Sequence, residues 1–308
     1  MPVELEYDYN EATAAMDKFS QEDINELRLW TQKLDKSKYV PKDLTDKQLV
    51  LFYNACYGDM DKTKACIERY YSVRKNAPEF FDFRVLNTEE MRQSMEALEF
   101  AVLPGKSCEG YDIIYHRLFD TEPSKYHFEN GVKLLMMTVD LCLSKRGPQP
   151  GQIFLFDMRG VKFGHITRVS LSFQRDRQRP LRKFFQYIQE AMPVRMRAIH
   201  VLNTEPVLDK LMLLIKPFME KRFSDMLKFH NKNEDLENFY ETVIPRSSIP
   251  PQYGGTALES QTLHKKCMQQ LQLLEPYFKA EEEQRIAALP DKKREKAMER
   301  AFKNLDID

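Results

Sequence analysis

The first part of the chain alternates apolar and polar residues at helical spacing. Ser20 opens a helix N-terminal signature, with the acid Asp23 in the capping-box position and apolar residues following it at helical spacing. Asp46–Ala55 and Asp61–Arg74 show the same spacing, and Gly58 separates them. Three helices joined by short turns predict a small helical bundle at the N-terminus.

After residue 78 the pattern changes to short runs of branched and aromatic residues. The clearest run is Gly151–Gly160, which is bounded by glycines and is typical of a strand. Pro180–Met192 has helical spacing and precedes a further run, so strand, helix and strand predict a βαβ unit with a right-handed crossover. The other predicted strands are Tyr111–Leu118, Met196–Asn203 and a short last one at Met226–Phe229, and Leu98–Leu103 is a short apolar run before Pro104. This order predicts an α/β fold.

Two helical segments follow the strands. Glu205–Phe223 is apolar around most of its circumference, so it is either a buried core helix or a helix that faces a lipid. Pro217 is expected to bend it. Residues 262–303 are helical in pattern and highly charged apart from a break at Pro290, which favours a solvated helix.

The composition excludes several classes of protein. The 308 residues carry 47 basic and 47 acidic side chains, which excludes a globally basic nucleic-acid binder. Apolar residues make up 42% of the chain, too much for a disordered protein. Residues 1–26 hold eight acids and one base, the reverse of a secretory leader, and Val132–Leu143 is too short and too charged to span a membrane. Five cysteines without a CxxC pair indicate reduced thiols, so we expect a cytoplasmic protein.

Positive charge is concentrated in the middle of this neutral chain. Residues 145–200 contain 12 bases and three acids, a net charge of +9. Such a block is either solvated or faces phosphates, as on an anionic membrane, where each base contributes about 1 kcal/mol to reversible docking.

Motifs for catalysis and metal binding are missing from the sequence. Gly105-Lys106-Ser107 resembles the end of a phosphate-binding loop, but Phe100 stands where the loop requires glycine. The histidines lack metal-site spacing, there is no GxSxG motif, and His200 lies in a predicted strand as a core histidine would. Asp157 precedes a tight turn and is expected to cap it. We therefore expect no enzyme activity, no cofactor and no metal.

Six fragments of the chain have a recognisable order and spacing: they are Ile114–Arg117, Asp120–Tyr126, Phe154–Gly160, Met192–Asn203, Ile215–Phe218 and Ile249–Gly255. In this order and spacing they resemble the CRAL-TRIO (Sec14-like) lipid-binding family, in the branch of α-tocopherol transfer protein and cellular retinaldehyde-binding protein. The resemblance covers the chain from about Leu44 to Gly255.

The resemblance implies an N-terminal helical lobe and a lipid-binding α/β lobe with a mostly parallel sheet, an apolar cavity and a mobile lid helix. The expected domains are the helical lobe at residues 11–78, the CRAL-TRIO domain at residues 90–258 and a charged helical extension at residues 259–308. The lid matches Glu205–Phe223. The pocket residues that the resemblance implies are Phe154, Phe156, Phe184, Phe185, Ile188, Leu208, Leu211, Met212 and Ile215.

Relatives in this branch bind phosphoinositide head groups with basic residues near the lid. The matching residues here are Arg182, Lys183 and Arg222, with Lys216 and Lys221 nearby. The chain departs from the family pattern in the helix at 49–56, where Cys56 stands in place of an arginine that the family uses.

The resemblance implies a cytoplasmic, peripherally membrane-associated monomer that carries a hydrophobic small molecule, such as a retinoid, tocopherol or carotenoid, between membranes. The alternative is a phosphoinositide-binding membrane adaptor without a dedicated cargo. The net charge of +9 in residues 145–200 and the basic residues near the lid favour this second hypothesis.

Overall fold

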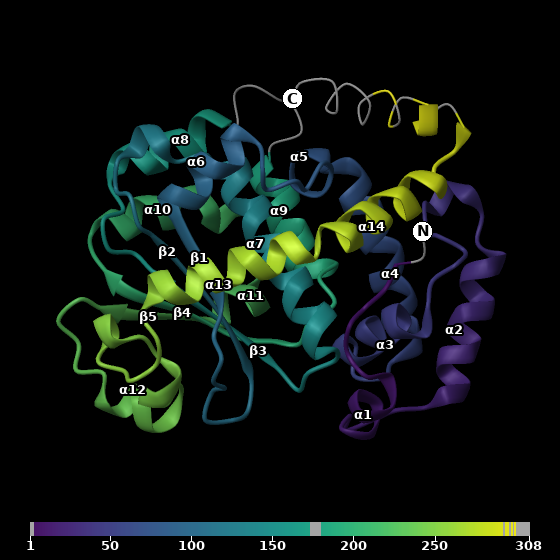
Figure 1. The fold of residues 1–308 in the computed structure, drawn as a ribbon, viewed down its shortest axis with the longest axis horizontal. Helices are drawn as coiled ribbons and strands as arrows, with labels where there is room; N and C mark the ends of the chain where they lie inside the picture. The colour runs from purple at the N-terminus through teal and green to yellow at the C-terminus, as the bar shows by residue number, and fades with distance from the viewer. Residues whose placement is uncertain (1–2, 173–179, 292, 296, 298, 300–308) are drawn as a thin grey trace.

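A five-stranded sheet runs through the larger lobe (Figure 1), in a computed structural model that describes residues 3–172, 180–291, 293–295, 297 and 299. The strand order is β1-β2-β3-β4-β5; β1 is antiparallel to β2, and the other neighbours are parallel. This confirms the expected α/β fold with a mostly parallel sheet. The strands are β1 (Leu98–Val102), β2 (Asp112–Leu118), β3 (Gln152–Asp157), β4 (Met196–Thr204) and β5 (Leu227–Asn231).

The N-terminal helices, from Tyr9 to Asn76, gather at the opposite side of the molecule from β5 (Figure 1). The Ser20 hydroxyl accepts a hydrogen bond from the backbone N–H of Asp23 at 3.2 Å, as its N-cap signature predicts. Thr45 and Gln48 form a full capping box at the next helix. These elements are α1 (Tyr9–Ala14), α2 (Gln21–Lys33), η1 (Lys36–Lys38), α3 (Asp46–Ala55) and α4 (Met60–Asn76), and α5 (Pro78–Phe81) follows them.

Helices connect the parallel strands. After α6 (Glu89–Ala97), β1, β2 and η2 (Pro123–Lys125), helix α7 (Phe128–Arg146) leads to β3. Helices α8 (Phe163–Ser172) and α9 (Pro180–Glu190) then lead from β3 to its parallel neighbour β4, which gives the predicted βαβ unit.

The prediction of a single helix over Glu205–Phe223 is wrong. The segment consists of α10 (Val207–Ile215), the short 3-10 helix η3 (Lys216–Phe218) and α11 (Lys221–Asp225). Pro217 lies inside η3, and because proline has no N–H and clashes with the preceding turn, the α-helix cannot continue through it.

The C-terminal elements pack on the body of the protein. They are α12 (Glu237–Thr242), η4 (Arg246–Ser248), η5 (Pro251–Tyr253), α13 (Ser260–Leu273) and α14 (Glu275–Ala287). Helix α13 contacts the edge strand β1. The backbone N–H of Phe100 donates a hydrogen bond to Nδ1 of His264 at 3.2 Å, so α13 occupies part of the edge of β1 that pairs with no strand. The charged segment 262–303 was expected to be solvated, but its helix α14 has a buried face that includes Glu281 and Arg285. The expected start of the C-terminal extension at residue 259 stays a prediction.

A buried ion network, which we call the core ion network, ties three distant segments together. Arg74 on α4 pairs with Asp140 on α7 at 2.8 Å and with Glu281 on α14 at 3.2 Å. Arg84, which follows α5, pairs with Asp140 at 2.7 Å and also with Glu281. The four side chains are at most 2% exposed, so every charge in the network depends on its partners.

Candidate functional site

One face of the sheet forms the floor of an apolar cavity. Strand residues alternate between the two faces of a sheet, and the strand residues that line the cavity are apolar apart from one histidine. These floor residues are Phe100 from β1, His116 from β2, Phe154 and Phe156 from β3, Met196, Ile199 and Val201 from β4, and Leu227 and Phe229 from β5.

Helices cover the rest of the cavity, which has a volume of about 260 Å³; most of their lining residues come from α7, α9 and α10, and α8 and α11 add Val169 and Phe223. Helix α7 contributes Val132, Leu135 and Met136; α9 contributes Phe184, Phe185 and Ile188; α10 contributes Leu208, Leu211, Met212 and Ile215. The nine residues that the family resemblance assigned to the pocket all line this one cavity. Their contact with a ligand stays a prediction.

The contribution of α7 to the cavity wall was not predicted from the sequence, because Val132–Leu143 was considered only as a candidate membrane span. The signal was present, since this stretch is apolar on nearly all sides, as a helix buried between a sheet and other helices must be. No helix among the described residues is long and apolar enough to cross a membrane.

Helix α10 covers the cavity but is weakly attached. None of its residues is buried, and Leu213 is 77% exposed on its outer side. Its neighbours are η3 and α8, where the Lys210 ammonium lies 4.7 Å from the centre of the Phe163 ring. A segment with so little buried surface opens at a low free-energy cost.

His116 is the one ionisable histidine on the cavity wall among the described residues. Its ring stacks on Phe100 with centroids 4.2 Å apart. Nδ1 lies 3.0 Å from the carbonyl oxygen of Glu99, which can only accept, so Nδ1 carries the proton. Burial lowers the pKa of His116 to about 4, so the ring is neutral at pH 7 and Nε2 is a hydrogen-bond acceptor.

The five basic residues predicted to meet phosphoinositides have different surroundings. Arg182 and Lys216 are exposed. Lys221 pairs with Asp225 at 3.0 Å, and Arg222 donates to the carbonyl oxygen of Gln189 at 3.3 Å. Lys183 is buried, pairs with Glu79 at 2.8 Å and lines a second, separate pocket.

The wider basic block is only partly described. Arg175, Arg177 and Arg179, which belong to it, lie outside the described residues. At the departing family position, Cys56 follows α3 directly, and its thiol is hydrogen-bonded to that of Cys66, which lowers the pKa of Cys56.

The opposite face of the sheet holds the polar residues of the recognised motifs. Asp157 accepts hydrogen bonds from the backbone N–H of Arg159 at 2.9 Å, as expected for a turn cap, and from the Tyr253 hydroxyl at 2.6 Å. Gly255 is required by a close approach, because a Cβ there would lie 1.8 Å from the carbonyl oxygen of Ile249. These motif residues hold the C-terminal segment against the sheet.

His200 lies on the same face as Asp157, away from the cavity. Its Nδ1 is 3.0 Å from Nε2 of His230, and its ring packs against Phe239 of α12. It is therefore a hydrogen-bonded core histidine, as expected. Among the described residues, no group of His, Cys, Asp and Glu is arranged to hold a metal ion.

Comparisons with known proteins agree with this geometry. The family model described as CRAL/TRIO domain matches residues 96–255, and the model described as Pinta-like, UBA domain matches residues 17–91. The human protein named "Alpha-tocopherol transfer protein-like" is 26% identical over 220 residues, which cover 71% of this chain and 61% of the human protein. Clavesin-1 of Xenopus laevis is 20% identical over 156 residues, 50% of this chain and 44% of that protein.

A solved structure supports the fold. The crystal structure of Sfh5 aligns with a TM-score of 0.51 and 10% sequence identity, covering 80% of this chain and 92% of Sfh5. At this identity the likeness concerns the fold alone.

Proposed function

The chain belongs to the CRAL/TRIO family, and we propose from this premise that it binds a hydrophobic small molecule in the sheet cavity and transfers it between membranes. The observation that carries the proposal is an apolar cavity covered by a helix without a single buried residue. The protein would act as a cytoplasmic, peripherally membrane-associated carrier, not as an enzyme.

The energetics favour release at a membrane over release into water. Burying about 500 Å² of apolar ligand surface at about 25 cal/mol/Å² gives an upper estimate of about 12 kcal/mol, so escape into water would be slow. A cavity of about 260 Å³ is also slightly below the usual range of about 300–1,000 Å³ for ligand sites. We infer that α10 moves outward to admit and release cargo.

Organic extraction of the purified full chain, followed by mass spectrometry, is the direct test of a resident cargo. A carrier is expected to yield one stoichiometric retinoid, tocopherol or carotenoid, and to speed the movement of that labelled compound from donor to acceptor vesicles. If the transfer rates of all three classes are unchanged by the protein, the carrier proposal is wrong, and the adaptor without cargo takes its place.

Replacing Leu213 with aspartate is expected to slow vesicle-to-vesicle transfer about tenfold, because the outer side of α10 would lose an apolar side chain that meets lipid when the lid opens. The matched control is Leu273→Asp on α13, which is also 77% exposed. Equal transfer rates for the two variants would show that α10 is not the membrane-facing lid.

His116 supports a narrower proposal about the cargo. A neutral Nε2 on an apolar wall accepts a hydrogen bond from a ligand hydroxyl. We therefore expect retinol to bind more tightly than retinyl methyl ether, which lacks the donated proton, by about three- to tenfold. His116→Phe keeps the stacked ring and should abolish this difference in a fluorescence titration. A preference unaffected by the substitution would exclude His116 as the polar anchor.

A further inference from the structure

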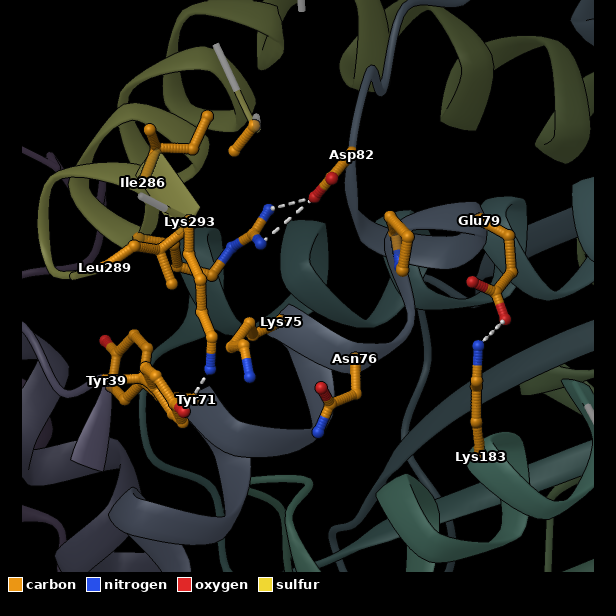
Figure 2. Close-up of a pocket in the computed structure, with 13 residues that line it drawn as sticks. Tyr39, Tyr71, Lys75, Asn76, Glu79, Asp82, Lys183, Ile286, Leu289 and Lys293 are labelled. Carbon is orange, nitrogen blue, oxygen red and sulfur yellow. Dashed lines mark hydrogen bonds and ion pairs between the residues drawn. The ribbon is translucent and has the colours of Figure 1, made fainter. Parts of the chain in front are cut away.

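A second pocket, which we call the interlobe pocket, lies between the N-terminal helices and α14. Its volume is about 380 Å³, and its walls come from the residue after η1, from α4, α5 and α9, and from α14 and the residues that follow it (Figure 2). None of the residues that line it lines the apolar cavity. Helix α9 separates the two sites, with Lys183 on the interlobe pocket and Phe184 on the cavity.

The interlobe pocket contains more positive than negative charge. Its walls carry four basic side chains, from Lys75, Lys183, Lys293 and Arg285, and two carboxylates, from Glu79 and Asp82. Both carboxylates already have partners: Glu79 pairs with Lys183 at 2.8 Å, and Asp82 pairs with Arg285 at 3.1 Å (Figure 2). Within the described part of the chain, Lys75 and Lys293 form no ion pair with a carboxylate.

Tyr39 brings these two lysines together. The Lys75 ammonium lies 3.8 Å from the centre of the Tyr39 ring, and the Lys293 ammonium lies 2.7 Å from the Tyr39 hydroxyl oxygen. Burial, and to a smaller extent the nearby Lys293, lowers the pKa of Lys75. Two like charges beside one ring repel each other, and an anion between them would remove that repulsion.

The backbone at Tyr39 is itself unusual. Its φ is +61°, in the left-handed region that a tyrosine rarely adopts. Strained backbone of this kind persists where the surroundings hold it and is common at ligand sites. Here the strained residue is the one whose ring contacts both unpaired lysines.

We propose that the interlobe pocket binds a small phosphorylated anion, with Lys75 and Lys293 neutralising the phosphate and the Asn76 amide at the wall donating a further hydrogen bond. Lysine ammonium groups bind phosphate as point charges, and two of them match a dianion. The pocket is larger than one phosphate requires, so a phosphate ester fits better than the bare ion. A ligand held by α4 and by the residues after α14 would link the N-terminal helices to the segment that follows α14.

The test uses the full chain and two variants with the same loss of charge. Lys75→Gln with Lys293→Gln removes the two proposed ligands, and Lys265→Gln with Lys279→Gln removes two exposed lysines of α13 and α14 that lie outside the pocket. Binding of soluble inositol trisphosphate is measured by calorimetry, and binding to phosphatidylcholine vesicles with or without phosphatidylinositol bisphosphate is measured by sedimentation.

The wild-type protein is expected to bind saturably, the Lys75/Lys293 variant at least about tenfold more weakly, and the Lys265/Lys279 variant unchanged. Loss of inositol trisphosphate binding in the Lys75/Lys293 variant, with unchanged vesicle binding, identifies a soluble phosphate ester as the ligand. Loss of binding to the bisphosphate-containing vesicles, with or without loss of inositol trisphosphate binding, identifies a lipid head group. Equal binding by the two variants, or no saturable binding of either probe by the wild type, would overturn the proposal. Thermal midpoints of both variants in the absence of ligand establish that they are folded.

Discussion

Replacing Asp140 with asparagine is expected to lower the free energy of unfolding by about 3–5 kcal/mol, the range measured when one partner is removed from a buried ion pair. Asp140 neutralises Arg74 and Arg84, whose side chains are 0% exposed. Asparagine keeps the shape of the side chain but removes its charge, so Arg74 and Arg84 would be left with the single carboxylate of Glu281, which also pairs with Arg285. Urea unfolding followed by circular dichroism measures the loss.

Asp120→Asn is the matched control. Asp120 also forms an ion pair, with Lys125 at 2.6 Å, but both side chains are substantially exposed, so its loss should reduce stability by less than about 1 kcal/mol. If Asp140→Asn destabilises the protein no more than Asp120→Asn does, the core ion network does not hold the fold together.

Acid is expected to destabilise the wild-type protein well above the pH at which carboxylates titrate. Burial lowers the pKa of both His116 and His200 to about 4, whereas an unfolded histidine titrates near 6.5. Between these values the unfolded chain binds more protons than the folded one, so stability falls as the pH falls from about 6.5 to about 4. The loss approaches about 3 kcal/mol for each ring at the end of this window.

The histidine contribution can be separated from that of the core ion network. The pKa of Glu281 is lowered to about 2, chiefly by its three arginine neighbours against the opposing effect of burial, so its contribution is lost only between about pH 4.5 and 2. A variant with His116→Phe and His200→Gln should show a shallower decline in unfolding free energy from pH 6.5 to 4.5, and the exposed His127→Gln should not. An unchanged slope in the double variant would show that these rings do not control acid stability.

Local patterns predicted the helices and strands because each carries its own signal. Residue pairs such as Ser20 with Asp23 define a helix start, and the run Gln152–Asp157 has the branched and aromatic residues of a strand. The sheet floor of the cavity and the position of α10 over it followed from the family resemblance together with these elements. The pocket residues on β3 are a clear case, since Phe154 and Phe156 are two positions apart and must share a face.

Features made by distant segments could not be predicted. The family resemblance assigned Lys183, together with Arg182, to the phosphoinositide-binding residues, but adjacent helical residues point in different directions, and Lys183 is buried beside Glu79. The burial of one face of α14 could not be predicted from the sequence for a similar reason. Glu281 and Arg285 have the polarity of solvated residues, and only the three-dimensional pairing with Arg74 and Arg84 explains their burial.

The core ion network also constrains the order of events during synthesis. Arg84 and Glu281 are 197 residues apart, so a chain growing from its N-terminus holds Arg74, Arg84 and Asp140 long before Glu281 is made. Pairings of such large sequence separation form late. Until α14 emerges from the ribosome, the nascent chain would have an excess of positive charge in an incomplete core beside an open apolar cavity. We therefore expect partly synthesised chains to depend on chaperones until α14 is available.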